Sequence, residues 1–188
     1  HEFMVPSPVG EDVLIRCMKC GYSANRERAE AAPIPREDHA TLQAPKEVLT
    51  PDKHTIQEVS NFLKVQSNQM VKTMIFISNG QPVAVLLRGD HEVNETKLAK
   101  ALGQDAIALA DHSTIENVTG ARVGFAGPMG LKIKIIADQA VTVLCNFVTG
   151  ANKSDTHLLN VNNERDFKID RIADIRYVTK GDKCPKCN

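Results

Sequence analysis

Residues 71–88, VKTMIFISNGQPVAVLLR, contain two β-rich runs that flank an Asn-Gly pair. Asn-Gly is a strong signal for a tight turn between antiparallel strands, because both residues tolerate a positive φ. We therefore expect strands over 71–78 and 82–88, joined as a hairpin at the centre of a sheet.

Helical patterns lie on both sides of this hairpin. A capping box, Thr55-Ile-Gln-Glu58, is followed by apolar residues at helical spacing, which predicts a helix over 55–65. Similar spacing predicts a second helix over 94–102. A third helix is expected over 113–119, where Ser113-Thr-Ile-Glu116 has the pattern of another capping box.

The C-terminal half reads as strands and loops. A glycine-rich loop, Gly124-Phe-Ala-Gly-Pro-Met-Gly130, precedes an alternating apolar run that predicts a strand over 131–137. The apolar stretch 141–147 fits either a strand or a helix, residues 150–155 indicate a loop, and 175–178 a last strand. Helices between paired strands favour a mixed α/β fold.

Charge and hydropathy narrow the class of protein. Lys plus Arg and Asp plus Glu both number 23, so the net charge is zero and no basic field predicts RNA binding by this chain alone. No apolar run approaches the roughly 20 residues of a membrane helix, and the first residues lack a signal sequence. We expect a soluble, cytoplasmic protein with no membrane partner.

Four of the five cysteines form two Cys-x-x-Cys pairs, Cys17 with Cys20 and Cys184 with Cys187. In a cytosolic chain, pairs at this spacing favour a metal over a disulfide. Four thiolates in tetrahedral geometry would make a closed structural zinc site. The alternative is a set of reduced, metal-free thiols. The fifth cysteine, Cys145, is expected to be a buried bystander.

Further motifs follow one another along almost the whole chain. They are Thr50-Pro51, Val71-Lys-Thr73, Leu87-Arg-Gly-Asp-His91 with Asn94-Glu95, Gly124-Phe-Ala-Gly-Pro128, Asp138, Gly150-Ala-Asn152, His157 and Ile172-Ala-Asp-Ile-Arg176. In this order and spacing they resemble the editing domain inserted in bacterial prolyl-tRNA synthetases. The segment from Gly124 to Pro128 fits the Gly-x-x-x-Pro loop of that superfamily.

The resemblance implies an architecture. It is a mixed α/β fold in which short helices wrap a central, mixed, barrel-like β-sheet, as in the bacterial aminoacyl-tRNA deacylases. The editing domain would span 50–180. An entry segment, 1–49, would carry the first cysteine pair and a proline-rich connection, and an exit segment, 181–188, the second pair. His1-Glu-Phe3 resembles a stub of the synthetase core, so we expect an excised piece of a longer protein.

The resemblance also implies a reaction, the hydrolysis of the ester bond of mischarged Ala-tRNA(Pro) without a cofactor. The expected partners are the acceptor end of that tRNA and the remainder of the synthetase in cis. The parent enzyme would be a homodimer whose ATP and Mg²⁺ bind outside this chain. Two alternatives remain open: a non-catalytic insertion that positions tRNA or stabilises the synthetase, and a deacylase that prefers Cys-tRNA.

Three residues carry the implied catalytic roles, and each has a structural alternative. Lys72 would bind a phosphate or carbonyl and stabilise charge in the transition state, or else reach from its strand to water. His157 would hydrogen-bond the substrate, or else be a solvated loop residue. Asp138 would orient Lys72 or bind the substrate's ammonium, or else be a carboxylate that ends a strand.

The implied substrate-binding residues are Thr50, Ile56, Val59, Thr73, Gly124, Gly127, Pro128 and Gly150. In the glycine-rich loop, backbone N–H groups could converge on an ester carbonyl as it becomes an oxyanion. Ile56 and Val59 would shape a small pocket, a role that is compatible with ordinary packing on a helix face. The loop's alternative is a plain turn between two elements.

Overall fold

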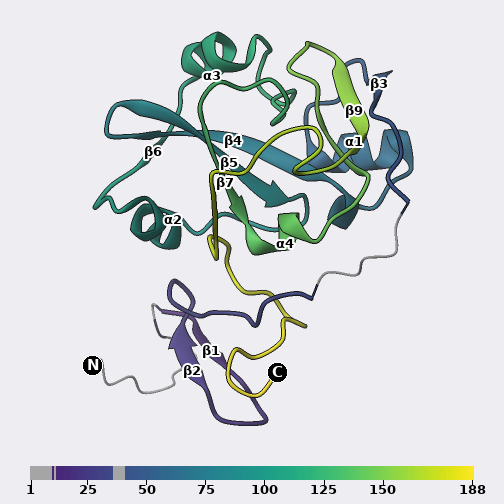
Figure 1. Cartoon of the computed structure of the whole chain (residues 1–188). Coiled ribbons are helices and arrows are strands. Elements are labelled where there is room, and N and C mark those ends of the chain that lie inside the picture. The colour runs from purple at the N-terminus through teal and green to yellow at the C-terminus, as the bar shows by residue number, and fades with distance from the viewer. Residues whose placement is uncertain (1–9, 11, 36–40) are drawn as a thin grey trace. The chain divides into compact units, whose positions relative to one another are not determined.

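The structure is a computed structural model that describes residues 10, 12–35 and 41–188, and the chain divides into two compact units (Figure 1). Unit 1 consists of the described residues up to Pro33 together with residues 177–188, and unit 2 of the described residues between Ile34 and Arg176. The stub expected at His1–Phe3 lies outside the described residues.

The predicted hairpin is the centre of unit 2. Strand β4 (Val71–Ser78) pairs antiparallel with β5 (Gln81–Arg88) over their whole length. Asn79 and Gly80 both have positive φ, 50° and 71°, which is the backbone that a two-residue hairpin turn of the right twist requires. The prediction from residues 71–88 is confirmed.

Two sheets are built around this hairpin. The larger has the order β10-β7-β5-β4-β6, with β7 (Lys134–Asp138) parallel to β5, β10 (Arg171–Ala173) parallel to β7, and β6 (Ala108–Leu109) antiparallel to β4. The smaller is antiparallel, with the order β3-β9-β8, and consists of β3 (Lys46–Leu49), β8 (Phe147–Gly150) and β9 (Thr156–Val161). A parallel bridge between Met70 and Val148 connects them.

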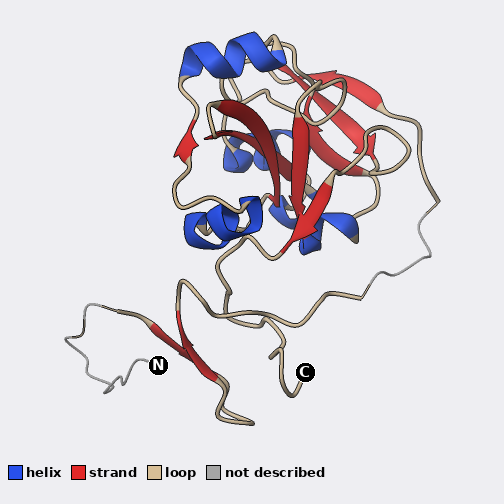
Figure 2. Ribbon diagram, turned by 60° about the vertical axis from the view of Figure 1, so that its left-hand side comes forward, coloured by secondary structure: helices blue, strands red, loops and turns tan. Residues whose placement is uncertain are grey.

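The mixed α/β class is confirmed, but the sheet is not a closed barrel in the part of the chain that the structure describes. The strands divide into an open five-stranded sheet and an open three-stranded sheet. Figure 2 shows both sets of strands with helices around them (Figure 2).

Alternating residues of β5 supply two hydrophobic clusters, because successive side chains of a strand point to opposite faces. Ala84 and Leu86 belong to a cluster with Ile115 of α3 (His112–Thr119), Phe147 of β8, and residues of β9. Val85 and the residues two positions before and after it belong to a second cluster, together with residues of α2 (Glu95–Leu102). The central sheet is thus covered on both faces.

The helices lie where the sequence predicts them, but one of the predicted caps is different. Helix α1 (Ile56–Leu63) begins at the predicted capping box, and α2 begins after Asn94. Helix α3 is capped by Asp111, whose side chain accepts from the Thr114 N–H, so the capping box predicted at Ser113 is wrong. A 3₁₀ turn, η1 (Ser67–Gln69), leads into β4.

Three predictions for the C-terminal half need correction. The strand expected over 131–137 starts later, as β7. The stretch 141–147 is neither one strand nor one helix, because α4 (Gln139–Thr142) ends inside it and β8 begins at its end. The strand expected over 175–178 lies earlier, as β10, and only Arg176 of that range forms a bridge, with Val93.

Unit 1 contains one hairpin among its described residues, β1 (Leu14–Arg16) paired antiparallel with β2 (Ser23–Asn25). The first cysteine pair lies in the turn between these strands, and the second lies in residues 177–188. Among the residues that the structure describes in both units, no helix has the length and apolar character needed to cross a membrane.

Candidate functional site

A cavity of about 180 Å³ lies in unit 2 beside the first turns of α1 and the start of β4. Its lining also includes the end of β8 and the glycine-rich loop. Thirteen residues line it: His54, Thr55, Ile56, Val59, Met70, Val71, Lys72, Thr73, Gly124, Ala126, Thr149, Gly150 and His157.

Local sequence fixes the helix wall of this cavity. The Thr55 hydroxyl accepts from the Glu58 N–H at 3.2 Å, and the Glu58 carboxylate accepts from the Thr55 N–H at 3.0 Å, so the capping box is complete. The helix that starts here buries Val59 in a cluster with Met70 and Val148. The apolar wall of the cavity therefore also ties α1 to β8.

Lys72 brings a cation to the cavity. It is the second residue of β4 and lies opposite Leu87 of β5. Burial lowers the pKa of its ammonium, while the carboxylates of Glu92 and Asp90 act in the opposite direction. A partly buried ammonium at the wall of a small cavity is suited to bind a carbonyl oxygen or an anion.

His157 lies on β9 and not in a loop, and it is 4% exposed. Its Nδ1 lies 2.7 Å from Oγ1 of Thr50, which is fully buried. Burial lowers the pKa of the imidazole to about 4, so the ring is neutral at physiological pH. The Phe125 ring packs edge-on against it, with the centroids 5.6 Å apart.

Two threonine hydroxyls in the cavity wall have no hydrogen-bond partner in the described part of the chain. They belong to Thr73 of β4 and Thr149 of β8, and both oxygens are buried. Buried polar atoms in proteins are nearly always paired, so such an atom in a cavity calls for a partner that enters from outside. Thr73 was among the predicted site residues, whereas Thr149 was not.

The glycine-rich loop is held against β8 by very close backbone contacts. A Cβ on Gly127 would overlap the Gly150 carbonyl group, and a Cβ on Gly150 would overlap the carbonyls of Phe125 and Ala126. Asn152 clamps the loop, since its Oδ1 accepts from the Gly127 N–H at 2.8 Å and its Nδ2 donates to the Gly127 carbonyl at 3.0 Å. Glycine is needed at both positions because nothing larger fits.

This clamp limits which loop N–H groups can face a ligand. The Gly127 N–H is occupied by Asn152, and the Phe125 N–H donates to the Arg122 carbonyl at 3.2 Å. Between them, Ala126 lines the cavity. The sequence led us to expect several loop N–H groups to converge on a ligand. Of these, the N–H groups of Ala126 and Gly124 remain as candidates.

Asp138 lies away from this cavity. Its carboxylate accepts from the N–H groups of Ala140 at 2.9 Å and Ile175 at 3.1 Å, and Oδ1 lies 3.6 Å from Nε of Arg176. Burial raises its pKa, against the effect of these donors. Over the described residues no hydrogen bond or ion pair joins it to Lys72, and its contacts match the alternative of a carboxylate that ends a strand.

The structure brings together most of the predicted site residues. Seven line the cavity, namely Ile56, Val59, Lys72, Thr73, Gly124, Gly150 and His157. Thr50 lies behind His157, and Gly127 and Pro128 lie in the loop without lining the cavity. Sequence reasoning did not assign the other six lining residues to the site, namely His54, Thr55, Met70, Val71, Ala126 and Thr149. For Thr149 and Ala126, the signal was their position beside Gly150 and inside the Gly-x-x-x-Pro loop.

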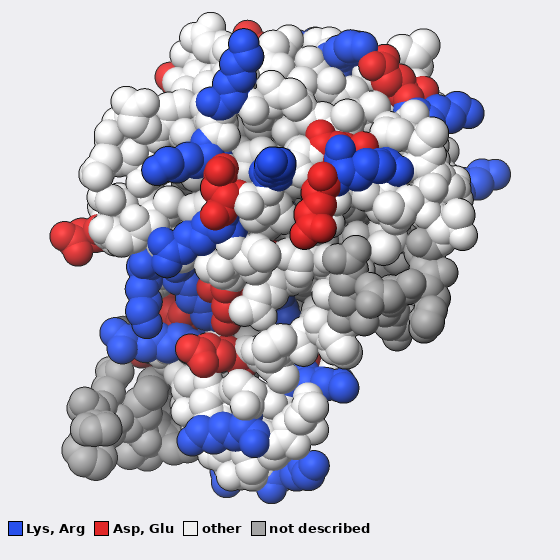
Figure 3. All heavy atoms as spheres, in the orientation of Figure 1, with Lys and Arg blue, Asp and Glu red and all other residues white. Residues whose placement is uncertain are grey.

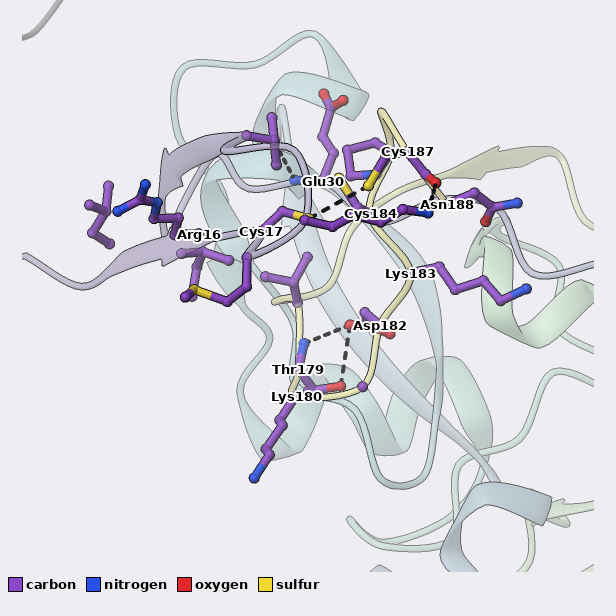
Figure 4. Close-up of a pocket in the computed structure, with 18 residues that line it drawn as sticks. Arg16, Cys17, Glu30, Thr179, Lys180, Asp182, Lys183, Cys184, Cys187 and Asn188 are labelled. Atoms are coloured by element: carbon purple, nitrogen blue, oxygen red, sulfur yellow. Dashed lines mark hydrogen bonds between the residues drawn. The ribbon is translucent and has the colours of Figure 1, made fainter.

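A second cluster of functional groups lies in unit 1. The Sγ atoms of Cys17, Cys20, Cys184 and Cys187 all lie within 4.8 Å of one another, so these residues could hold a metal ion. Figure 4 shows the Cys17 and Cys187 sulfur atoms facing each other, with Cys184 beside them (Figure 4). Cys145 belongs to unit 2 and is only partly buried.

Comparisons with known proteins bear on the cavity. The model of the family described as aminoacyl-tRNA editing domain matches residues 50–167, which include every residue of the cavity lining. Proline–tRNA ligases from Geotalea daltonii and Caldicellulosiruptor saccharolyticus are each 50% identical to the chain over 187 residues. These matches cover 100% of this chain but 33% and 32% of the relatives, so the chain spans about a third of their length.

Solved structures share the fold of unit 2. One is described as hypothetical protein APE2540, with a TM-score of 0.59 and 21% identity over 71% of this chain and 91% of that one. Another is described as a candidate trans-editing enzyme for prolyl tRNA synthetase, with a TM-score of 0.59 and 15% identity over 71% of this chain and 87% of that one. At these identities the likeness concerns the fold alone.

Proposed function

Because this chain belongs to the family of aminoacyl-tRNA editing domains, we propose that its cavity hydrolyses the ester bond of mischarged Ala-tRNA(Pro). The observation that carries the proposal is a cavity of about 180 Å³ in which a lysine, a neutral histidine and two unpartnered hydroxyls meet. A site of this size suits a small amino acid.

A small editing site solves a physical problem for an enzyme that selects proline. A pocket built for a larger side chain cannot strongly reject a smaller one, because each missing methylene is worth only about 1–3 kcal/mol of discrimination. A second site that admits alanine and excludes proline would correct the error. The walls formed by Ile56, Val59 and Met70 would set the upper limit on size.

In the proposed reaction, a water oxygen attacks the carbonyl carbon of the alanyl ester. The carbonyl oxygen gains negative charge, the bond to the ribose oxygen breaks, and the ribose oxygen takes up a proton, which leaves free alanine and tRNA. Lys72 and the Ala126 N–H are the cavity's candidates to stabilise the oxyanion. We propose no cofactor for this step, with the free ribose hydroxyl assisting the water.

The contact between Thr50 and His157 supports one tautomer of the imidazole. Thr50 is fully buried, and among the described residues its hydroxyl hydrogen has one acceptor, Nδ1 of His157. If Thr50 donates, Nδ1 carries no hydrogen and the neutral ring carries it on Nε2. His157 would then act as a hydrogen-bond donor to a substrate oxygen, and its neutral ring could not serve as a counter-charge.

The unpartnered hydroxyls suggest where the amino group of alanine binds. Hydroxyl oxygens accept hydrogen bonds, and the ammonium of an aminoacyl ester offers three donors. We propose that Thr149 and Thr73 receive that ammonium. Asp138, which lies elsewhere, would keep a structural role at the end of β7.

The wider context is also a proposal. The relatives that cover the chain are proline–tRNA ligases, so we propose that this domain edits in cis within such an enzyme in the cytoplasm. The parent would be a homodimer that binds ATP and Mg²⁺ outside this chain, and its other domains would supply most of the grip on tRNA. The domain limits proposed from the sequence, 50–180 for the editing domain, are close to the family match at 50–167.

The decisive experiment measures hydrolysis of Ala-tRNA(Pro), Cys-tRNA(Pro) and Pro-tRNA(Pro) by the chain, by Lys72→Ala and by Lys134→Ala. Lys134 is an exposed lysine of β7 outside the cavity lining and serves as the matched control. We expect rapid loss of alanine alone, a decrease of at least about 100-fold in Lys72→Ala, and no change in Lys134→Ala. Faster hydrolysis of the cysteinyl ester would establish the alternative deacylase. Absence of activity, repeated in the full-length enzyme, would favour a tRNA-positioning insertion.

A further inference from the structure

The four clustered thiols of unit 1 are spaced for a metal and not for disulfides. Sγ of Cys17 lies 3.6 Å from Sγ of Cys187, and Sγ of Cys20 lies 3.6 Å from Sγ of Cys184. A disulfide would place sulfur atoms about 2.05 Å apart. Four thiolates arranged tetrahedrally at about 2.3 Å from Zn²⁺ lie roughly 3.8 Å from one another. These two separations are close to the second arrangement, and all four sulfur atoms lie within 4.8 Å of one another.

The two cysteine turns have the same local construction, although they lie far apart in the sequence. The Gly21 N–H donates to the Cys17 carbonyl at 3.0 Å, and the Asn188 N–H donates to the Cys184 carbonyl at 3.0 Å. In both turns the donor is the fourth residue after the first cysteine. The Lys186 N–H also points at the Cys184 sulfur, at 3.4 Å. The four Sγ atoms of these two turns lie within 4.8 Å of one another.

The described part of unit 1 lacks a hydrophobic core that would hold its two segments together. Among its described residues, Ala29 is the one buried hydrophobic side chain. Contacts between the two segments include the hydrogen bond from the Ala32 N–H to the Lys183 carbonyl at 2.8 Å and the one from the Lys19 ammonium to the Cys187 carbonyl at 3.4 Å. The Arg26 guanidinium also lies over the Tyr177 ring, 4.3 Å from its centroid. Units this small generally depend on a metal, a disulfide or a partner for their stability.

We propose that Cys17, Cys20, Cys184 and Cys187 bind one structural Zn²⁺, and that this ion is the main element holding unit 1 together. Four thiolates fill the tetrahedral coordination of zinc and leave no open position for a substrate, so the site is structural and not catalytic. The ion joins the segment that precedes unit 2 to the segment that follows it. This inference is independent of the editing reaction.

Metal content tests the site directly. The chain, purified without added metal, is expected to carry about one zinc per molecule by mass spectrometry. Cys17→Ser and Cys184→Ser should each reduce that content at least about fivefold. The matched control is Cys145→Ser, which removes the cysteine that lies outside the cluster and should leave the content unchanged. Equal zinc in all three variants, or iron in place of zinc, would overturn the proposal.

A second measurement remains informative if the serine variants do not fold. Co²⁺ supplied to the wild-type chain should produce the thiolate-to-metal absorption of a tetrahedral four-sulfur site. Chelation should then accelerate hydrogen exchange in unit 1, for example at the Cys17 N–H that donates to Tyr22, while the N–H groups of β4 and β5 keep their protection. Unchanged exchange in unit 1 after removal of the metal would show that the ion does not hold it together.

Discussion

His157 is protected from protonation by its surroundings on β9. Burial lowers the pKa of its ring to about 4, whereas the same group titrates near pH 6.5 in an unfolded chain. The unfolded state therefore binds more protons between these two values. By linkage, stability is lost as the pH falls from about 6.5 to about 4, by up to about 3 kcal/mol.

We predict two consequences for His157. Urea denaturation of the wild-type chain should give a lower midpoint at pH 4.5 than at pH 7, and His157→Gln should reduce that difference. Hydrolysis should show no step near pH 6.5, because the ring is already neutral there. An imidazole titration near pH 6.5, followed by NMR, would contradict the burial argument.

The unpartnered hydroxyl of Thr149 leads to a prediction in which activity and stability separate. Thr149→Val replaces a buried, unsatisfied oxygen with a methyl group of similar shape, so stability should be unchanged or higher. If the hydroxyl binds the substrate, kcat/KM for Ala-tRNA(Pro) should fall about tenfold, since one such hydrogen bond is worth about 1.4 kcal/mol.

Thr119 provides the matched control for this substitution. Its hydroxyl is buried like that of Thr149 but donates to the Ile115 carbonyl at 2.8 Å and lies outside the cavity lining. Thr119→Val should therefore lower the melting temperature and leave kcat/KM unchanged. Loss of stability in Thr149→Val, with unchanged kinetics, would mean that this hydroxyl has a structural partner.

The sequence identified Lys72 and His157 through the family resemblance, because their residue types alone favour the structural alternatives. Both residues line the cavity. Neither Thr149 nor Asn152 was given a role in the site, although Asn152 belongs to one of the family motifs, because a threonine in a strand and an asparagine in a turn are ordinary residues. Their roles arise only when β8 meets the glycine-rich loop.

Among the elements, α3 offers a test of how its first turn is stabilised. The Asp111 carboxylate accepts from the Thr114 N–H at 2.8 Å and from the Ser113 hydroxyl at 3.1 Å. Asp111→Ala should therefore destabilise the fold by about 1 kcal/mol, whereas Ser113→Ala should change it by less than about 0.5 kcal/mol. Denaturant midpoints of the two variants distinguish the two caps. A larger loss of stability in Ser113→Ala than in Asp111→Ala would support the capping box at Ser113 that the sequence predicted.

Elements defined by nearby residues were predictable, and those defined by distant ones were not. The hairpin of β4 and β5 follows from its own alternation and its Asn-Gly turn. In contrast, β3 follows a proline-rich stretch, and β9, with sequence THLLNV, lacks a regular apolar alternation. These two strands exist because β9 pairs with β3 on one side and with β8 on the other. No local pattern encodes that pairing.

For the whole molecule, charge sets the expected strength of RNA binding. The net charge is zero, and on the face shown in Figure 3 the basic and acidic side chains are interspersed (Figure 3). Few phosphate contacts imply few released counterions. We predict that the affinity of this chain for uncharged tRNA(Pro) changes less than about tenfold between about 50 and about 200 mM salt. A steeper change, measured by fluorescence anisotropy, would reveal a basic surface that the overall balance conceals.

The meeting of Cys20 with Cys184, which are 164 residues apart in the sequence, has a further thermodynamic consequence. As long as unit 1 stays closed, the intervening chain unfolds as a ring and not as a linear polymer. A ring of this length has lost conformational entropy that corresponds to about 5 kcal/mol in favour of the folded state. The cysteine cluster would thus raise the melting temperature of β4, β5 and their neighbours by restricting their denatured ensemble.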